Sequence, residues 1–496
     1  MSHQPVAHPD WKAPTGDGEY LIWPTAEELL RQASQTHRRL EHENGVKIQN
    51  VPLAELRRRQ RQIMGVEAHQ PLIASGHQTE LYHPGVWVKD VLSWQAAKKL
   101  GGVAYHIAVD TDHPKHITLR WPGGSAPITD DPRLTGAAWS GLLVAPGSAY
   151  LNELTTLLTG AAAQWTFSPL IFDFLAALAR ESVETRSLST ALTLAIFNDE
   201  YLGVRQMPIL SSMLFVSPVF LAFAHHIIAH AAEFAVKYNA ALAEYRRANG
   251  IKSKTRPMPD LAAGEDWCEI PFWQDQLQSQ SRSRARVERR DGTWRLMEFA
   301  FDPGADAWEA ADKLMAFLLQ RDLRLSARAL TLTLFARLLM ADQFVHGIGG
   351  ARYDQVTDAL AASYFGIEPP PFCVTTATLY FPEAAGRSRV CLPCLQMEGH
   401  HLAHAVLGEG KKKWLERIAA APRRSAERQA AFSQMHGEIA AVGRNRAELK
   451  KWEDRYEDAL RRDTQEQGWF DRELFYAMQP KERLSQLIAK YESVFA

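Results

Sequence analysis

PLIASGHQTELYHPGVWVKDVLSWQAAKKLGGVAYHIAV, residues 71–109, contains two apolar runs on either side of a helical pattern. The runs at 71–75 and 103–109 have the length and composition of buried strands. Residues 86–100 are helical in pattern and stop at two glycines. A strand, a helix and a second strand in this order are typical of a βαβ unit, in which the two strands are parallel. The sequence therefore predicts an α/β fold built on a parallel sheet.

Composition and charge exclude several classes of protein. The 496 residues are 46% hydrophobic and 23% charged, which is ordinary for a globular protein of about three domains. The 56 basic and 57 acidic residues nearly cancel, so no overall field attracts nucleic acid or an anionic membrane. Residues 213–236 are the most apolar stretch, but their proline, three histidines and glutamate indicate a buried helix rather than a membrane span. With four cysteines and no apolar leader, we expect a cytoplasmic protein without a disulfide framework.

Other parts of the chain add elements to this core. We predict further helices in four stretches: 24–68, 168–200, 218–248 and 307–320. Residues 115–165 are rich in Gly, Pro, Ser and Thr, which favours irregular structure. The pair Asp291-Gly292 beside an alternating run predicts a small antiparallel β element.

The C-terminal part of the chain has a different character. After about residue 400 it is charged and contains few β-branched residues. Phe432, Met435, Ile439 and Val442 follow a 3-4-3 spacing. This spacing predicts a long helical hairpin or a short coiled coil. The apolar seam either packs back on the same chain or joins two copies in a homodimer.

Polar residues gather directly after the first predicted strand. The candidates for binding or catalysis in this loop are Gly76, His77, Gln78, His83, Gly85 and Lys89. Glycines permit close backbone approach, and a new helix offers N–H groups to an anion. His77, His83 and Lys89 are therefore candidates for stabilising phosphate or carboxyl charge. The alternative is a hydrogen-bonded loop without function, and the stretch is no Walker A loop because it lacks GxxxxGK[ST].

A second polar cluster, Asp112-His113, follows the strand predicted at 103–109. Because neighbouring parallel strands end at the same edge of a sheet, this cluster is expected beside the first loop. Asp112 and His113 are candidates for a base, an amine-binding pair or a metal site. The alternative is a polar turn.

A third cluster repeats this arrangement later in the chain. His346, Gly349, Gly350 and Arg352 follow an apolar run and precede a predicted helix. We consider them candidates for binding a substrate or nucleotide, although such glycines also mark tight turns and close packing.

Cys391 and Cys394 form a Cys-x₂-Cys pair, and His400 and His404 follow at i, i+4 spacing. Two thiolates and two imidazoles can hold a zinc ion tetrahedrally. The alternative is a pair of small buried thiols at the start of a helix that carries histidines. A zinc site here would be independent of any chemistry at the sheet.

Several blocks of the chain together resemble the cysteine-adding enzyme family of bacillithiol synthesis. Gly76-His77-Gln78 resembles the Gly-x-Gln loop of that family, and Asp112-His113 resembles its Asp-His motif after the next strand. Gly349-Gly350, a helix and Phe365-Gly366-Ile367 resemble a third block. The closing residues Phe475–Leu484 are also similar, and all blocks keep the family's order along the chain.

The resemblance implies a Rossmann-like core related to class I aminoacyl-tRNA synthetases, with an inserted region and a dimerising coiled coil. It also implies an activity that joins cysteine to glucosaminyl-malate. We therefore expect an α/β protein with a Rossmann-like parallel-sheet core, a small β insertion and a helical coiled-coil arm. The expected divisions are an N-terminal helical segment at 1–60, core parts at 61–260 and 301–390, the insertion at 261–300 and the arm at 391–496.

The leading hypothesis is a ligase-like enzyme that joins an amino acid to an amine-bearing small molecule, with ATP or ADP as a candidate cofactor. Asp112 would hold or deprotonate the attacking amine, which must be neutral to act as a nucleophile. His346 and Arg352 would close the site, and a His83→Ala replacement is expected to abolish turnover. Two alternatives stay open: a nucleotidyl transferase that uses the same sheet edge, and a non-catalytic metabolite-binding protein that recruits a partner through its coiled coil.

Overall fold

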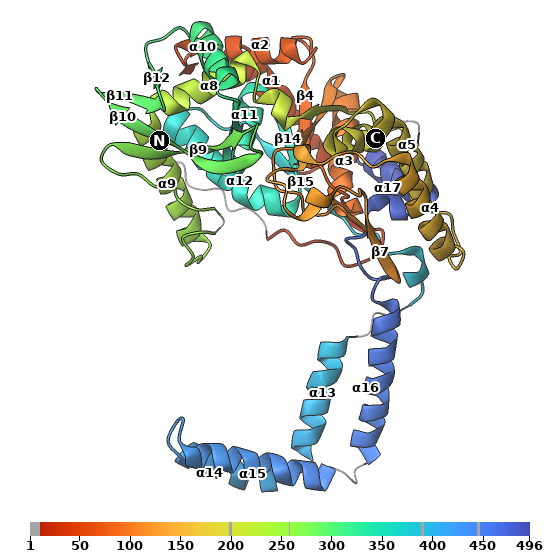
Figure 1. Ribbon diagram of the computed structural model, residues 1–496. Helices are drawn as coiled ribbons and strands as arrows, with labels where there is room; N and C mark the ends of the chain where they lie inside the picture. Colours follow the sequence, from red (N-terminus) through yellow and green to blue (C-terminus); the bar gives the residue numbers. More distant parts are fainter. Residues whose placement is uncertain (1–9, 198–200, 257, 388–390, 444–446) are drawn as a thin grey trace. The chain divides into compact units, whose positions relative to one another are not determined.

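The computed structural model describes residues 10–197, 201–256, 258–387, 391–443 and 447–496 (Figure 1). The chain divides into two compact units. Unit 1 holds the described residues of Met1–Arg120, Ser125–Leu379 and Arg472–Ala496, and unit 2 holds those of Trp121–Gly124 and Tyr380–Asp471. The closing residues therefore belong to unit 1, whereas the sequence placed them in the C-terminal arm.

The centre of unit 1 is a six-stranded sheet in the order β1-β15-β14-β4-β5-β8. Its strands are β1 Tyr20–Trp23, β15 Phe372–Ala377, β14 Gln343–His346, β4 Leu72–Gln78, β5 Val103–Val109 and β8 Met207–Leu210. β1 is antiparallel to β15, and all other neighbours are parallel, which confirms the predicted parallel sheet. Numbered along the chain, the parallel strands lie in the order 3-2-1-4-5, so the strand order reverses between β4 and β14.

The predicted βαβ unit is confirmed as β4, α3 (Pro84–Leu100) and β5. α3 ends at Gly101, whose φ of 62° is the left-handed conformation that a glycine adopts readily at a helix end. α3 packs against β4, β5, β14 and β15. The buried Asp90 carboxylate on α3 holds this arrangement. It accepts hydrogen bonds from Ser75 Oγ at 2.7 Å and from the Tyr82 hydroxyl at 3.1 Å, and it lies 2.8 Å from His106 Nδ1. These contacts hold β4 and β5 against α3.

Unit 1 contains further helices among its described residues. They are α1 Ala26–Glu41, α2 Leu53–Ile63, α4 Ser148–Ala162, α5 Ile171–Glu184, α6 Leu188–Phe197, α7 Ser211–Leu214, α8 Pro218–Ala229, α9 Ala231–Ala248, α10 Ala307–Gln320, α11 Ala329–Leu339, α12 Ile348–Leu360 and α17 Lys481–Ser493. α10 has the bounds that the sequence predicted.

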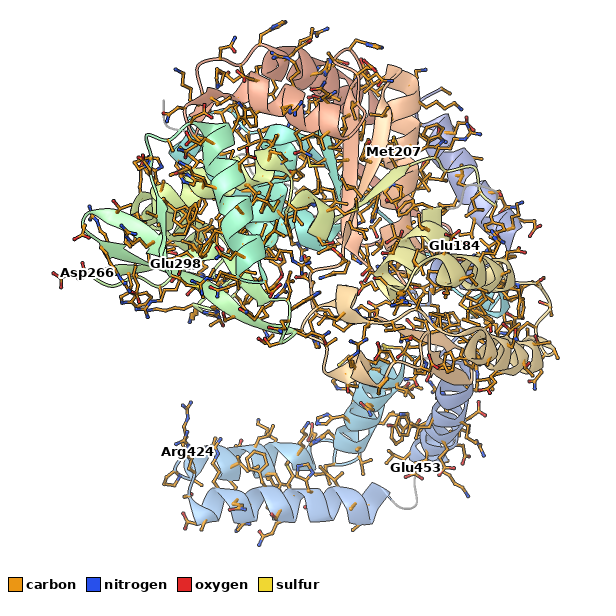
Figure 2. The ribbon with its side chains drawn as sticks, turned by 45° about the horizontal axis from the view of Figure 1, so that its top comes forward. Glu184, Met207, Asp266, Glu298, Arg424 and Glu453 are labelled. Carbon is orange, nitrogen blue, oxygen red and sulfur yellow. A yellow bond between two sulfur atoms is a disulfide. The ribbon has the colours of Figure 1, made fainter. Side chains whose placement is uncertain are left out.

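Two local expectations were wrong, and the strand β8 was not predicted at all. The helix expected at 24–68 is interrupted by the short hairpin of β2 (Lys47–Ile48) and β3 (Val51–Pro52). The stretch expected to be irregular contains β6 (Thr118–Trp121), β7 (Gly124–Pro127) and α4. β8 is short and contains a proline, so its pattern is weak. Its first residue, Met207, is exposed (Figure 2).

The most apolar stretch forms two helices instead of one. α8 and α9 are bent by 89° relative to each other, with a break at His230. Val219, Phe220 and Phe223 of α8 are fully buried in the apolar core. Among the described residues no single helix is long and apolar enough to cross a membrane, and only this bent pair passes by length and composition.

The predicted β insertion is confirmed but extends further than 261–300. It is a five-stranded antiparallel sheet in the order β12-β11-β10-β9-β13. The strands are β9 Trp267–Gln276, β10 Ser281–Arg290, β11 Thr293–Leu296, β12 Phe299–Phe301 and β13 Leu323–Ala327. Asp291 and Gly292 have φ values of 51° and 77°, as a tight hairpin turn requires. β13 leads directly into α11, so the insertion sets the position of that helix.

Unit 2 is helical, as predicted for most of the arm. Its helices are α13 Leu392–Ala405, α14 Gly410–Ala420, α15 Ala426–Gly443 and α16 Ala447–Glu466. α13 packs against α16, and α14 packs against α15. Met435 and Ile439 are buried with Ile418 of α14, whereas Phe432 and Val442 are about two-fifths exposed. Half of the predicted seam therefore packs within the chain, and the coiled coil and the homodimer stay predictions.

Candidate functional site

A cavity of about 240 Å³ lies where the strand order of the parallel sheet reverses. The ends of β4 and β14 line it through Gly76, His77, Gln78 and His346. Its other lining residues are Ile107, Val109, Asp112, Met258, Ala327, Ala329, Leu330, Leu332, Thr333, Ala336, Phe344, Gly350, Tyr353 and Asp354. Ligands of open α/β sheets bind outside the carboxyl ends of the strands at such a point. Because ligand pockets for larger molecules span roughly 300–1,000 Å³, this cavity suits a molecule of amino-acid size.

The first two predicted clusters meet at this cavity. β4 and β5 pair in parallel with Gln78 opposite Val109, so the residues that follow the two strands lie side by side. Gln78 Nε2 donates a hydrogen bond of 3.0 Å to Asp112 Oδ2. The structure thus places the half-buried Asp112 carboxylate beside the end of β4. His113 does not line the cavity. Its ring is exposed, and its Nδ1 lies 2.8 Å from the Ala137 carbonyl oxygen.

A histidine and an aspartate form a buried pair on the other side of the cavity. His346 Nε2 lies 2.9 Å from Asp354 Oδ2. The fully buried Arg337 donates to the same oxygen at 2.6 Å. Although burial acts in the opposite direction, Arg337 and His346 hold the pKa of Asp354 well below its usual range. Asp354 is therefore a carboxylate that accepts a hydrogen bond from the Nε2–H of His346. His346 Nδ1 carries no proton and is free to accept one.

Burial lowers the pKa of His346, although Asp354 opposes this shift. The imidazole is therefore neutral near pH 7. Gly350 keeps the space beside it open, because a Cβ at this position would lie 2.8 Å from His346 Nδ1. Gly350 and Asp354 stand four residues apart on α12 and so share the face that meets His346.

His77 is held by Glu80, with Nε2 2.8 Å from Oε1. Burial, together with the charge of Lys89, lowers the pKa of His77 to about 4, so this ring is also neutral near pH 7. Lys89 does not line the cavity. Its ammonium group donates a 2.6 Å bond to the Gly76 carbonyl oxygen, and burial lowers its pKa to about 8. Lys89 therefore supports the backbone at the end of β4 rather than a ligand.

His83 and Gly85 serve the start of α3 and lie outside the cavity lining. His83 is the N-cap residue, and its Nδ1 accepts the Gly85 N–H at 3.1 Å. A Cβ at Gly85 would lie 2.6 Å from the Ala377 carbonyl oxygen, so this glycine allows α3 to approach β15 closely. Burial, with a contribution from Arg472, lowers the pKa of His83 to about 3. His83 therefore caps α3, and Gly85 lets α3 pack closely on β15.

Replacing His83 with alanine is expected to destabilise unit 1 by about 0.5–2 kcal/mol, because the Gly85 N–H loses its acceptor. A His83→Asn variant keeps an acceptor for this N–H and is the matched control. Thermal unfolding should show a lower midpoint for the alanine variant and a midpoint near wild type for the asparagine variant. Unchanged stability of both, together with lost turnover, would assign His83 to the chemistry instead.

Arg352 and Gly349 also lie outside the cavity lining. Arg352 is exposed and donates a 3.0 Å bond to the Trp11 carbonyl oxygen, with Asp10 at 3.6 Å. It stands two residues after Gly350, so it projects from a different face of α12. Gly349 is exposed, and a Cβ there would meet no atom within 4 Å.

The four residues proposed for zinc do not form a metal site in the structure. Cys391 and Cys394 are joined by a disulfide bond, so neither sulfur is a thiolate that could bind a metal. His400 and His404 lie further along α13, with ring centroids 4.3 Å apart. Across the part of the chain that the structure describes, no group of three or more His, Cys, Asp or Glu is placed to hold a metal ion.

Sequence reasoning missed several residues of the cavity. Asp354 stands eight residues after His346, at the end of the third cluster, and was given no role, although its helical spacing from Gly350 places both on one helix face. Thr333 and Leu330 come from α11, whose approach to the cavity depends on β13. No local pattern indicates this contact.

Two comparisons with known proteins give no family to compare with this geometry. No protein-family model matches the chain, and no curated protein matches it either.

Proposed function

We propose that the chain is a ligase-like enzyme that joins an amino acid to an amine-bearing small molecule on a Rossmann-like sheet. The single observation that supports this proposal is the convergence of Asp112 and the His346–Asp354 pair on one small cavity. The resemblance to the cysteine-adding enzymes suggests cysteine as the amino acid. The cavity volume of about 240 Å³ agrees with a substrate of that size.

Asp112 would bind the substrate ammonium group. Its carboxylate is held by Gln78 and is half-buried at the cavity wall, where water screens a charge less than in bulk solvent. The apolar remainder of the lining, from Ile107 to Phe344, would exclude water around the reacting groups. A cationic substrate head therefore finds its partner at this end of the cavity.

His346 would take the proton that the amine must lose before it attacks. Its Nε2–H is directed to Asp354, which keeps Nδ1 as the acceptor. Asp354 would then stabilise the imidazolium that forms, while Arg337 keeps Asp354 ionised. His346 Nδ1 takes one proton from the bound ammonium group and leaves the neutral amine. The amine nitrogen then bonds to the acyl carbon of an activated amino-acid donor, the bond from that carbon to the leaving group breaks, and the leaving group departs with the electron pair and takes the second proton of the nitrogen.

The cavity supports the binding of ATP or ADP less well than the binding of an amine substrate. The described residues that line the cavity include no lysine or arginine, so they offer no cationic side chain to phosphate groups. Lys89 and Arg352, the cations expected there, are bonded to backbone carbonyls. We therefore derive no step through ATP or ADP, and the nucleotidyl transferase alternative gains nothing from this geometry. The homodimer and the cytoplasmic location remain parts of the proposal.

The decisive assay incubates the purified chain with cysteine, glucosaminyl-malate, ATP and magnesium, and detects the ligated thiol by mass spectrometry. The proposal expects a product with the wild type and none above background with Asp112→Asn. The matched control is His113→Ala, because His113 is exposed and turned away from the cavity. Absence of product from a panel of amino acids and amine acceptors would refute the ligase proposal.

Gly349 and Gly350 are neighbours on α12, and only Gly350 lies against His346. Alanine variants of the two therefore separate crowding of the His346 ring from the general effect of placing alanine in this helix. Gly350→Ala is expected to push the imidazole aside and lower kcat/KM on the order of 10²-fold, as small misplacements of reacting groups do. Gly349→Ala meets no atom and is expected to be neutral in activity. The NMR titration of His346 provides a second readout, which should change in the Gly350 variant only. Equal behaviour of both variants would contradict the role given to Nδ1.

A further inference from the structure

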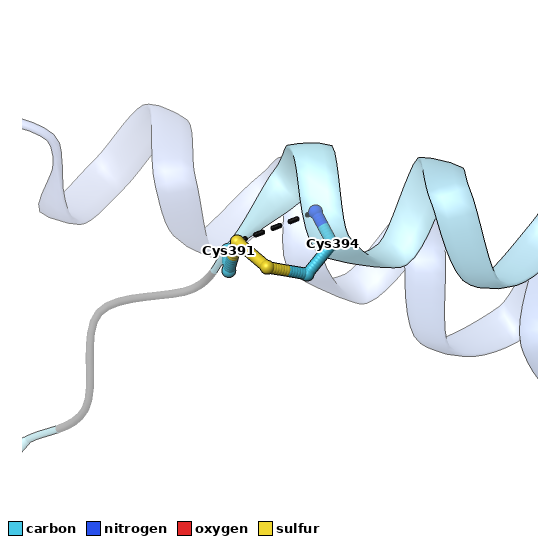
Figure 3. The surroundings of a disulfide bond; sticks show 2 residues. All are labelled: Cys391 and Cys394. Atoms are coloured by element: carbon cyan, nitrogen blue, oxygen red, sulfur yellow. Dashed lines mark hydrogen bonds between the residues drawn. A yellow bond between two sulfur atoms is a disulfide. The ribbon is translucent and has the colours of Figure 1, made fainter.

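The disulfide between Cys391 and Cys394 closes a very short loop (Figure 3). The two residues are three positions apart, and both lie at the first turn of α13. A disulfide stabilises a fold mainly by limiting the unfolded chain, and it does so least when the closed loop is short. This bond also joins no second helix to α13. It is therefore not a structural cross-link.

α13 is held in unit 2 by other contacts. Trp452 Nε1 of α16 donates a 2.8 Å bond to the Leu395 carbonyl oxygen. Gln396 Nε2 donates to the Tyr456 hydroxyl at 2.8 Å, and Arg455 pairs with Glu398 at 3.0 Å through both nitrogens. These contacts begin just after the disulfide and do not involve it. The packing of α13 on α16 would therefore survive its reduction.

The disulfide differs from the other cysteines in its exposure. Cys391 and Cys394 are both exposed. Cys268 and Cys373 are buried free thiols, and burial raises their pKa values to about 11 and about 12. Those two thiols are therefore unreactive near pH 7, whereas an external thiol can reach the disulfide.

The start of α13 favours a thiolate on one of the two sulfurs. Cys391 is the N-cap residue, and its Sγ accepts the Cys394 backbone N–H at 3.3 Å. Helix N-termini carry partial positive charge and stabilise a thiolate at this position. We propose that Cys391 and Cys394 form a thiol–disulfide exchange site for a small thiol, with Cys391 as the attacking sulfur.

The exchange balances with a small disulfide, RSSR, as the oxidant. The Cys391 thiolate attacks one sulfur of RSSR, the S–S bond breaks, and RS⁻ leaves and takes a proton. The Cys394 thiolate then attacks Cys391 Sγ in the mixed disulfide and releases the second RS⁻. The protein dithiol loses two electrons, and RSSR becomes two RSH. The reverse sequence opens the disulfide when RSH is in excess.

The first test equilibrates the folded chain in glutathione buffers of graded oxidised-to-reduced ratio. Acid quenching, alkylation and peptide mass spectrometry report the fraction of the Cys391–Cys394 pair that is reduced. The proposal expects this fraction to follow the ratio reversibly, while the labelling of the free thiols Cys268 and Cys373 stays the same at every ratio. A pair that is reduced only after denaturation would overturn it.

The second test separates the two sulfurs. In Cys394→Ser, oxidised glutathione should form a stable mixed disulfide on Cys391, and iodoacetamide should alkylate Cys391 on the order of tenfold faster than it alkylates Cys394 in Cys391→Ser. Both positions are exposed, and far-UV circular dichroism checks that both variants keep their helices. Equal trapping and equal alkylation rates would overturn the assignment of Cys391. Neither test depends on the ligase proposal, because neither measures ligation.

Discussion

Replacing His346 with alanine is expected to lower kcat of the proposed ligation by about 10²–10⁴-fold, the usual contribution of a general base. The variant removes the proton acceptor and leaves Asp354 paired with Arg337. Because the ring is small and lies at the cavity wall, the loss should appear in kcat more than in stability. Steady-state kinetics on the ligated product measures the effect, and near-UV circular dichroism confirms the fold.

The pH dependence of kcat/KM tests the role of His346 as the base in an independent way. His346 acts only when it is neutral, so kcat/KM should fall as the pH drops through its pKa. Since burial lowers that pKa, the fall should occur below the usual histidine value of 6.5. Arg352→Ala is the control, because Arg352 lies outside the cavity and should leave both rate and profile unchanged. A profile that is unaltered in His346→Ala would exclude His346 as the base.

Replacing Asp342 with asparagine is expected to destabilise unit 1 by about 3–5 kcal/mol, because it leaves buried cations without their carboxylate. The side chain of Asp342 is completely buried. Its oxygens contact Arg57, Arg61 at 3.0 Å and the Leu72 N–H at 2.7 Å. Asp342 precedes β14, so this cluster fixes the strand that ends at His346. The midpoint of urea unfolding measures the effect.

Glu288→Gln is the matched control, since Glu288 forms an exposed ion pair with Arg290 and its loss should leave the midpoint unchanged. Acid provides a second check. Although burial acts to raise it, Arg57 and the neighbouring cations hold the pKa of Asp342 well below 3.8. Its contribution is therefore present above that value and is lost as the pH falls toward the depressed pKa. The stability difference between wild type and Asp342→Asn should shrink on acidification, and a constant difference would contradict the ion cluster.

Local patterns were sufficient where a short segment carries its own signal. The apolar runs that became β4 and β5 and the helix between them could be identified, because strand and helix periods differ and Gly101 ends the helix. The break at His230 could not, since both sides of it are equally apolar. The short strand β8 was missed for a similar reason, because four residues with a proline carry little pattern.

For the candidate site, too, some residues that line the cavity were identified from the sequence, and others were given the wrong role. His77, Gln78 and Asp112 were identified because each follows a predicted strand, and His346 because it follows an apolar run and precedes a predicted helix. His83 and Lys89 were given functional roles that the structure assigns to a helix cap and a backbone contact. Polar residues at a helix start look alike in sequence whether they bind a ligand or the chain itself.

The order of residues along the chain was enough to predict the first two parallel strands, β4 and β5, and the polar groups at their ends, because those features depend on neighbours a few positions away. Only the tertiary structure shows that β14 lies beside β4, with Gln343 opposite Ile73. That pairing joins segments 270 residues apart and creates the cavity between His77 and His346. Asp342 shows the physical reason, since its partners come from α1, α2 and β4 and no local spacing relates them.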